Sequence, residues 1–239
     1  MRGQIFLDAV AGKNEDEIYA ASVRRAEGLY FCFYWPGRQG RPLSDVGVAV
    51  SRDGFNFSRV KDGQRVLPPR FPRRVDAGYI FQMNPLLEPG SDTVRVYYRA
   101  TAARREGTEE FDHFLTEVGV ATIRVNGFTY YAPRHSTRTG SVTTIPIESP
   151  AGAKRGLAVN FDTAAGKGGW LAVEVLDAAT WEAREGFTLA DCRVRSTGGL
   201  ALPVAWRRGE AVPAGRPIGL RFHLAGSATR LYSFGFRDL

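Results

Sequence analysis

The sequence is poor in the residues that build disulfides and metal centres: its 239 residues include two cysteines and three histidines. Cys32 lies in the apolar run LYFCFYW, which predicts a buried core thiol, and a disulfide with the distant Cys192 has little support. The histidines have no metal-ligand spacing, so we expect no metal site and a surface or core role for each. They are His113, His135 and His223.

Long apolar runs and cofactor motifs are also missing. No stretch approaches the length that spans a membrane, so no membrane partner is expected. The N-terminal run MRGQIFLDAVAG is too short for a signal peptide and is interrupted by Asp8. The sequence therefore predicts a leaderless chain of unknown compartment, cytoplasmic by default. GKGGW at 166–170 lacks the P-loop pattern and no G-x-S-x-G elbow occurs, so we expect no cofactor.

The net charge of +7 is not concentrated in one stretch. Arginine pairs at 24–25, 73–74, 104–105 and 207–208 are scattered along the chain, with no dense stripe and no recognisable binding module. We therefore expect a solvated basic surface and no nucleic-acid partner.

Short apolar runs bounded by glycine, proline, aspartate and asparagine recur about every eight to twelve residues, which is typical of an all-β protein. The stretch 14–28 competes for a helix, because Asn14 and Glu17 have capping-box spacing. Its counterpart in the repeat described next, YIFQMNPLL, contains Pro85 and has no helical pattern. We therefore expect strands in both places.

Four sequence elements occur twice in the same order, and each repeat spans roughly fifty to sixty residues, the length of a propeller blade. The alignment sets Asp53-Gly54 against Asn126-Gly127, and both pairs suit a hairpin turn. Since an amide replaces the acid, we expect a structural turn and no calcium or sugar ligand at Asp53. The paired segments are DEIY and DAGY, GLYFCFYW and DTVRVYYRA, VGVAVSRDGF and VGVATIRVNGF, and FNFSRV and FTYYAP.

After residue 138 the strands keep a period-two alternation but lose the repeat. Seven or so strands in about one hundred residues is what a β-sandwich needs. We therefore expect incomplete propeller blades at 1–137 and a β-sandwich domain at 138–239. Trp170, Trp181 and Trp206 either form a lectin-like platform or pack against the propeller, and packing is favoured.

The order of DEIY, an aromatic strand, V-A-V-S-R-D-G-F-x-F and D-x-G-x-I-x-x-x-x-P resembles the five-bladed β-propeller glycosidases, which include invertase/levanase-like and arabinanase-like enzymes. The second region, from SVTTIPIE to LYSFGF, looks like the β-sandwich that follows such propellers. The resemblance implies a partial β-propeller, about two blades of a five-bladed type, followed by a β-sandwich. Since five blades need roughly fifty residues each, we expect a fragment, or an assembly in which another chain supplies the missing blades.

The resemblance also implies a set of carboxylates at the starts of the inner strands, where they converge on one pocket. The expected catalytic residues are Asp76, Asp16 and Glu17, and the expected substrate-binding residues are Tyr79, Gln82 and Tyr19. One carboxyl must be protonated to release the leaving oxygen while another stays ionised. In the alternative interpretation Asp76 is a turn residue, and the acidic run at 14–17 is solvated.

These residues predict a glycoside hydrolase-like protein that hydrolyses glycosidic bonds by carboxylate acid/base chemistry if the missing blades are supplied, with a carbohydrate as partner. Two alternatives stay open: a non-catalytic carbohydrate-binding or structural module, and a sialidase-like propeller with an arginine triad. Two blades leave an open sheet edge and an uncovered face. We therefore expect association, limited solubility or cover from the C-terminal region.

Overall fold

The computed structural model describes residues 17–26, 28–37, 46–60, 65–67, 79–87, 92–101, 116–134, 139–148, 154–163 and 168–239. No α-helix occurs in this part of the chain, and residues 17–26 form a strand, so the all-β prediction is confirmed. The strands are β1 (Glu17–Ala26), β2 (Leu29–Gly37), β3 (Val46–Ser51), β4 (Ser58–Arg59), β5 (Arg65–Leu67), β6 (Tyr79–Leu87), β7 (Thr93–Thr101), β8 (Thr116–Arg124), β9 (Gly140–Thr143), β10 (Arg155–Asp162), β11 (Trp170–Asp177), β12 (Gly199–Pro203), β13 (Ile218–Ala225) and β14 (Arg230–Asp238).

The chain divides into two compact units, residues 1–124 and residues 125–239. The boundary expected at 137–138 lies outside the described residues, and the assignment of 1–137 and 138–239 as domains stays a prediction.

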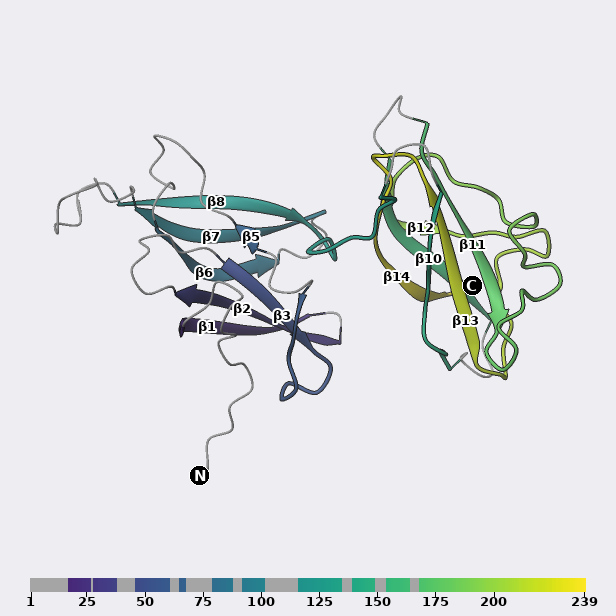
Figure 1. Cartoon of the computed structure of the whole chain (residues 1–239), viewed down its shortest axis with the longest axis horizontal. Helices are drawn as coiled ribbons and strands as arrows, with labels where there is room; N and C mark the ends of the chain where they lie inside the picture. The colour runs from purple at the N-terminus through teal and green to yellow at the C-terminus, as the bar shows by residue number, and fades with distance from the viewer. Residues whose placement is uncertain are drawn as a thin grey trace. The chain divides into compact units, whose positions relative to one another are not determined.

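The first unit contains two antiparallel sheets (Figure 1). The first sheet has the strand order β1-β2-β3-β4, with β5 also paired to β3, and the second sheet has the order β6-β7-β8. Strand β6 lies next to β2 and β3, so the two sheets are neighbours within this unit. In each sheet three strands that are consecutive in the sequence lie side by side, β1-β2-β3 in the first and β6-β7-β8 in the second. This arrangement agrees with the prediction of about two propeller blades.

The VGVA motif has a steric origin. Tyr34 of β2 pairs with Gly47 of β3, and Tyr98 of β7 pairs with Gly119 of β8. At both glycines a Cβ would overlap the ring of the paired tyrosine, so only glycine leaves room for the ring on the neighbouring strand. The ring in turn covers backbone that glycine leaves bare. This shared pair sets the same register in both sheets and confirms the repeat.

The turn after the motif shows that the alignment of the turns is wrong by one residue. Gly54 lies eight residues after Val46, Asn126 lies eight residues after Val118, and both have a positive φ, 82° and 53°. Gly54 and Asn126 are therefore equivalent, because each is the left-handed residue of its turn. Asp53 then corresponds to Val125, which has no hydrogen-bonding side chain.

The last element of the repeat also differs between the two copies. In the first sheet β4 pairs with β3 opposite Ala49 and Val50. In the second copy Tyr131 instead exchanges two 2.9 Å backbone hydrogen bonds with Leu231 of β14. The alignment of FTYYAP with FNFSRV is therefore wrong at this point, because FTYYAP finds its backbone partner in the second unit.

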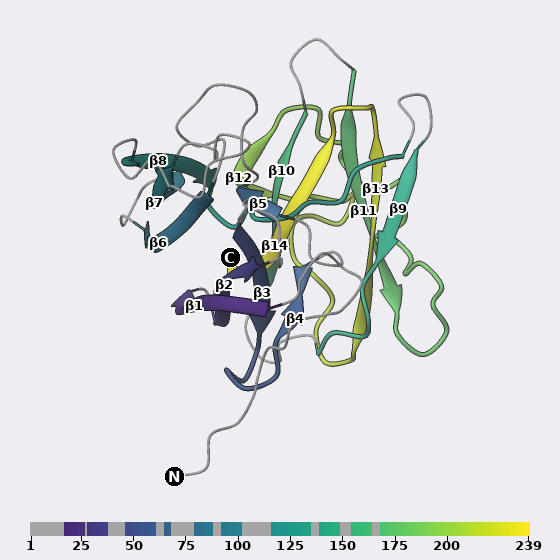
Figure 2. The same cartoon turned by 60° about the vertical axis from the view of Figure 1, so that its left-hand side comes forward.

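Two three-stranded sheets, β12-β10-β14 and β11-β13-β9, make up the second unit (Figure 2). The alternating residues recognised in the sequence form one core cluster between these sheets, and each is at most 2% exposed. The unit is therefore a β-sandwich. The alternating residues are Leu157, Val159 and Phe161 of β10, Leu171, Val173 and Val175 of β11, and Ile218, Leu220, Phe222 and Leu224 of β13.

Strand β11 pairs with β13 along one edge, and irregular segments satisfy its other edge. The indole Nε1 of buried Trp206 donates to Val173 O at 2.7 Å, and Val173 N–H donates to the Cys192 sulfur at 3.2 Å. Val175 N–H donates to Phe187 O at 3.1 Å. Burial raises the pKa of the Cys192 thiol, which remains unpaired like Cys32 and acts here as a structural acceptor.

The tyrosine–glycine pair predicts the effect of adding a methyl group to the glycine. Gly47→Ala and Gly119→Ala should each lower the free energy of unfolding by about 1–3 kcal/mol, because the new Cβ overlaps the tyrosine ring. Denaturant unfolding followed by tryptophan fluorescence measures this. Gly235→Ala is the control, since a Cβ there meets no atom within 4 Å, and its change should stay within about 0.5 kcal/mol. Equal effects at all three glycines would refute the steric explanation.

Candidate functional site

Four of the six predicted site residues lie in the first strand of each blade-like sheet. Glu17 and Tyr79 are the first residues of β1 and β6. Tyr19 lies within β1 and Gln82 within β6, and only the backbone of these two residues is described. Asp16 and Asp76 lie outside the described residues, so the grouping of these residues into one pocket stays a prediction.

Strand pairing relates the two first strands residue by residue. Ala21 of β1 pairs with Tyr34, and Gln82 of β6 pairs with Tyr98. Because these tyrosines are equivalent in the repeat, Ala21 and Gln82 occupy equivalent positions. Gln82, a predicted substrate-binding residue of the second sheet, therefore corresponds to an alanine, Ala21, in the first sheet.

A β-bulge shifts this relation at the start of the strands. The register of β1 changes between Ile18 and Ala20, which adds one residue to that strand. As a result Glu17, opposite Gly37, is the equivalent of Tyr79, opposite Thr101. The alignment of DEIY with DAGY, which matches Tyr19 with Tyr79, is therefore out of register, because Glu17 and not Tyr19 is the equivalent of Tyr79.

One face of the first sheet is closed. Cys32, Tyr34 and Ala49 are fully buried there. The side chains of Ile18 and Phe57 pack against them. Burial raises the pKa of the Cys32 thiol to about 11, although a nearby positive charge lowers it. The thiol is therefore protonated at neutral pH, and the prediction of a core cysteine is confirmed.

Asp53 organises the turn that follows β3. Its Oδ1 accepts hydrogen bonds from the backbone N–H groups of Phe55 and Asn56 and from the Ser51 hydroxyl, each at 2.8 Å. Its Oδ2 accepts a hydrogen bond from Asn56 Nδ2 at 2.7 Å. Hydrogen bonds from Asn56 and Phe55 hold the pKa of this carboxyl far below its usual range. Both oxygens serve the turn, which supports the structural role expected for Asp53.

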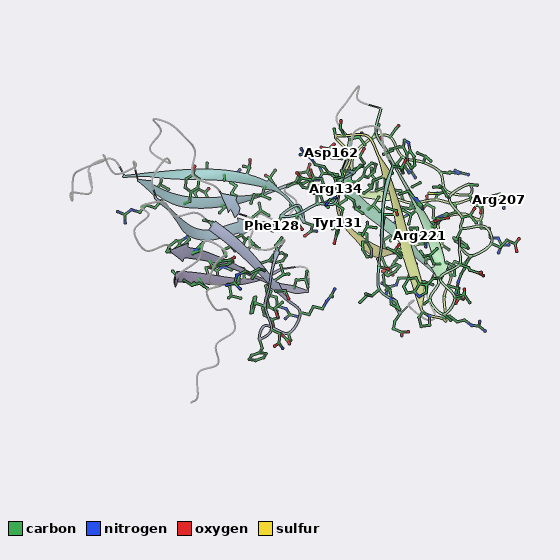
Figure 3. The ribbon with its side chains drawn as sticks, in the orientation of Figure 1. Phe128, Tyr131, Arg134, Asp162, Arg207 and Arg221 are labelled. Carbon is green, nitrogen blue, oxygen red and sulfur yellow. The ribbon has the colours of Figure 1, made fainter. Side chains whose placement is uncertain are left out.

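The second unit contains a buried carboxylate that the sequence patterns did not reveal. Glu174 of β11 is 9% exposed, and its Oε2 lies 2.8 Å from His223 Nε2 and 3.4 Å from a guanidinium nitrogen of Arg221. Of these residues, Figure 3 labels Arg221. Its Oε1 accepts the Leu189 N–H at 3.1 Å. Arg221 also donates from Nε to Thr143 Oγ1 at 3.3 Å. Through these contacts Glu174 of β11 is linked to β13, to the loop that contains Leu189 and, by way of Arg221, to β9.

Two opposing effects set the charge state of Glu174. Burial raises the pKa of its carboxyl, but hydrogen bonds from His223 and the Leu189 N–H, with the charges of His223 and Arg221, outweigh this and lower it overall. The carboxylate is therefore ionised at neutral pH, and three contacts, with Leu189 N–H, Arg221 and His223, occupy its oxygens. This arrangement fixes the 187–192 loop to the sheet, which is a structural task.

The tryptophans of the second unit do not form one platform. Trp206 is fully buried, and its ring lies edge-on to Phe187 with centroids 5.4 Å apart. Trp170 begins β11 and packs against the core. Trp181 follows the end of β11, lies over Gly219 and is 40% exposed. Within the second unit, then, Trp181 alone of the three offers an exposed ring face.

Neither a metal-binding cluster nor a membrane-spanning helix occurs in the described part of the chain. No three His, Cys, Asp or Glu side chains gather there in a way that would hold a metal ion. The same residues include no helix that is long and apolar enough to cross a membrane.

Comparison with known proteins gives a distant likeness of fold. No protein-family model matches the chain, and a comparison with curated sequences finds no relative. Among solved structures, a GH32 β-fructofuranosidase from Bombyx mori is similar over all of this chain and 69% of its own length, with 8% identity and a TM-score of 0.35. A mutant of that enzyme in complex with sucrose matches 96% of this chain and 67% of its own, with 8% identity and a TM-score of 0.32.

A further structure, described as a glycoside hydrolase, matches 96% of this chain with 10% identity and a TM-score of 0.29, and this chain spans 61% of its length. The structural neighbours are thus glycoside hydrolases. The likeness is distant and concerns the fold only.

The Glu174 contacts predict a pH-dependent contribution to stability. Glu174→Gln and Glu174→Ala should lower the free energy of unfolding at pH 7 by about 1.5–3 kcal/mol, since charge-assisted hydrogen bonds are lost. Because folding lowers the pKa of this carboxyl, the difference from the parent protein should be full above about pH 5 and shrink as the pH falls below about 4.

Thermal unfolding at several pH values measures this difference, and hydrogen exchange at Leu189 should rise in Glu174→Ala. Exposed Glu182→Ala serves as the control and should change stability by no more than about 0.5 kcal/mol. A loss for Glu174→Gln that does not vary with pH would contradict the assigned charge state.

Proposed function

We propose that the chain is a glycoside hydrolase-like protein that hydrolyses glycosidic bonds by carboxylate acid/base chemistry, with Asp76, Asp16 and Glu17 as the reactive residues when further blades complete the pocket. The proposal rests on the positions of these acids in the sequence. Each acidic segment leads into the first strand of a blade-like sheet, β1 in the first and β6 in the second. In a propeller, the blades surround a central channel, so corresponding ends of their first strands converge.

The chemistry requires two carboxyl groups in different states. One donates a proton to the leaving oxygen, and the other stays ionised to attack the sugar or to activate water. Placing carboxylates close together raises the pKa of one of them, which separates the two roles. We assign Asp76 first to this chemistry, and we assign Tyr79, Gln82 and Tyr19 to contacts with the carbohydrate.

A second candidate function is a non-catalytic carbohydrate-binding or structural module. The unequal register of the two acidic segments supports it, since Glu17 and not Tyr19 is the equivalent of Tyr79. In this case the pocket binds sugar without a matched acid and base. The two functions differ in whether the carboxylates are needed for turnover or only for binding.

Substitution of Asp76 distinguishes the two functions. The full chain is assayed with sucrose and with aryl arabinofuranosides and xylosides, and Asp76→Asn should lower kcat/KM by about 10²–10⁴-fold because an acid or base is removed. Asp92→Asn, which removes an exposed acid of the same unit, is the control and should leave the rate unchanged. A parent chain without hydrolysis but with sugar binding supports the module, and full activity of Asp76→Asn refutes the assignment.

A further inference from the structure

Trp181 presents an aromatic ring from a tight turn that follows β11. Its N–H donates to Asp177 O at 2.7 Å, and Asp177 N–H donates to Glu182 O at 2.9 Å. Ala179 N–H donates to Asp177 Oδ1 at 2.9 Å. These hydrogen bonds fix the backbone of the turn, while Trp181 itself is 40% exposed.

The backbone at Trp181 is unfavourable for a bulky residue. Its φ of 62° lies in the left-handed region, which costs energy for any residue except glycine. The other non-glycine residue with a positive φ in the described part of the chain is Asn126, whose short polar side chain tolerates this conformation. A large, exposed ring that is kept at such a cost points to a use for the ring itself.

Gly219 of β13 sets the position of the ring. It pairs with Leu176 of β11, and a Cβ on Gly219 would come within 2.8 Å of the Trp181 ring. Ile218 and Leu220, on either side of Gly219, belong to the sandwich core. Because successive residues of a strand point to opposite faces, Gly219 and the ring above it lie on the outer face of the sheet β11-β13-β9.

The same outer face continues from the ring to Arg221 (Figure 3). Arg221 is the next outward residue of β13, about 7 Å from Gly219 along the strand. In the described part of the chain its guanidinium donates from Nη1 to Glu174 and from Nε to Thr143. These bonds fix the group and use two of its five N–H donors. Since the side chain is 35% exposed, the remaining N–H groups can donate to a ligand.

A fixed ring beside fixed polar groups suits a neutral sugar. The C–H groups on one face of a sugar ring stack on the electron-rich face of an indole, and sugar hydroxyls accept hydrogen bonds from N–H groups. The carboxylate of Glu174 balances the charge of Arg221, which removes the attraction for an anion. A stable protein partner needs about 800 Å² on each side, more than one ring with polar neighbours provides.

We propose that Trp181 and Arg221 form a second carbohydrate-binding site, on the outer face of the sandwich, for a neutral polysaccharide. One sugar ring stacks on Trp181, and a hydroxyl of the neighbouring sugar accepts a hydrogen bond from Arg221. The site goes beyond the proposed function, since it lies in the second unit and contains none of the acids at 16, 17 and 76. It also differs from a platform of three tryptophans, because Trp170 and Trp206 take no part in it.

Quenching of tryptophan fluorescence by acrylamide tests the site in the unaltered full chain. Of the four tryptophans, Trp181 is exposed, whereas Trp35 and Trp170 are partly buried and Trp206 is buried, so Trp181 should dominate the quenching. The probes are the neutral polysaccharides inulin, levan, arabinan and xylan, and the acidic polygalacturonate. At least one neutral polysaccharide should protect Trp181 from acrylamide in a saturable way, and polygalacturonate should not.

Variants connect this binding to the ring, with calorimetric titration as the measurement. Trp181→Gly removes the ring but accepts the left-handed backbone, and it should raise Kd for the protecting polysaccharide by about 30-fold or more. Trp181→Phe, which restores a smaller ring, should recover part of the affinity. Tyr130→Ala removes another exposed ring of the same unit, 49% exposed, and should bind like the parent chain. Unfolding midpoints check that each variant is folded.

The proposed function fails or holds independently of this site. Trp181→Gly should leave kcat/KM on small aryl glycosides unchanged, and Asp76→Asn should leave polysaccharide binding unchanged. Binding that is lost in Asp76→Asn and kept in Trp181→Gly would place the sugar in the first unit and overturn the site at Trp181.

Two further outcomes would overturn the proposal. The first is that none of the four neutral polysaccharides protects Trp181 in the parent chain, a result that needs no variant. The second is self-association of the parent chain that Trp181→Gly abolishes in sedimentation experiments, which would make a second copy of the chain the occupant of this surface.

Discussion

The contact of a tyrosine ring with a glycine on the neighbouring strand is the constraint on which the first unit depends. It occurs at Tyr34 with Gly47 and again at Tyr98 with Gly119. Since a side chain on the glycine would displace the ring, each pair locks the register of its sheet. Every equivalence between the two sheets follows from these pairs, including the shift of one residue in the turns.

Much of the fold was predictable because its signals are local and periodic. The sandwich core follows from apolar residues at every second position, and the repeat follows from VGVA. The alignments of DEIY with DAGY and of the two turns were wrong. The amino-acid sequence does not reveal a bulge between Ile18 and Ala20, or which residue of a turn is left-handed. The backbone pairing of FTYYAP could not be predicted either, because its partner, Leu231, lies in a strand about one hundred residues away.

The candidate sites were less predictable than the fold. Glu174, Leu189, Arg221 and His223 meet only because β11 pairs with β13, and no spacing in the sequence announces the cluster. The one available signal was a glutamate inside the apolar strand WLAVEVLD, which requires a partner when buried. For the acids at 16, 17 and 76, the resemblance suggested the residue types. The strand register is needed to see that the DEIY and DAGY segments are not aligned with each other.

Proton NMR of the full chain tests whether the tyrosine–glycine pair occurs in both sheets. The Hα protons of both Gly47 and Gly119 should be shifted upfield by ring currents and show nuclear Overhauser contacts to the rings of Tyr34 and Tyr98, respectively. Such contacts at one glycine but not at the other would contradict a common register, and with it every equivalence drawn between the two sheets.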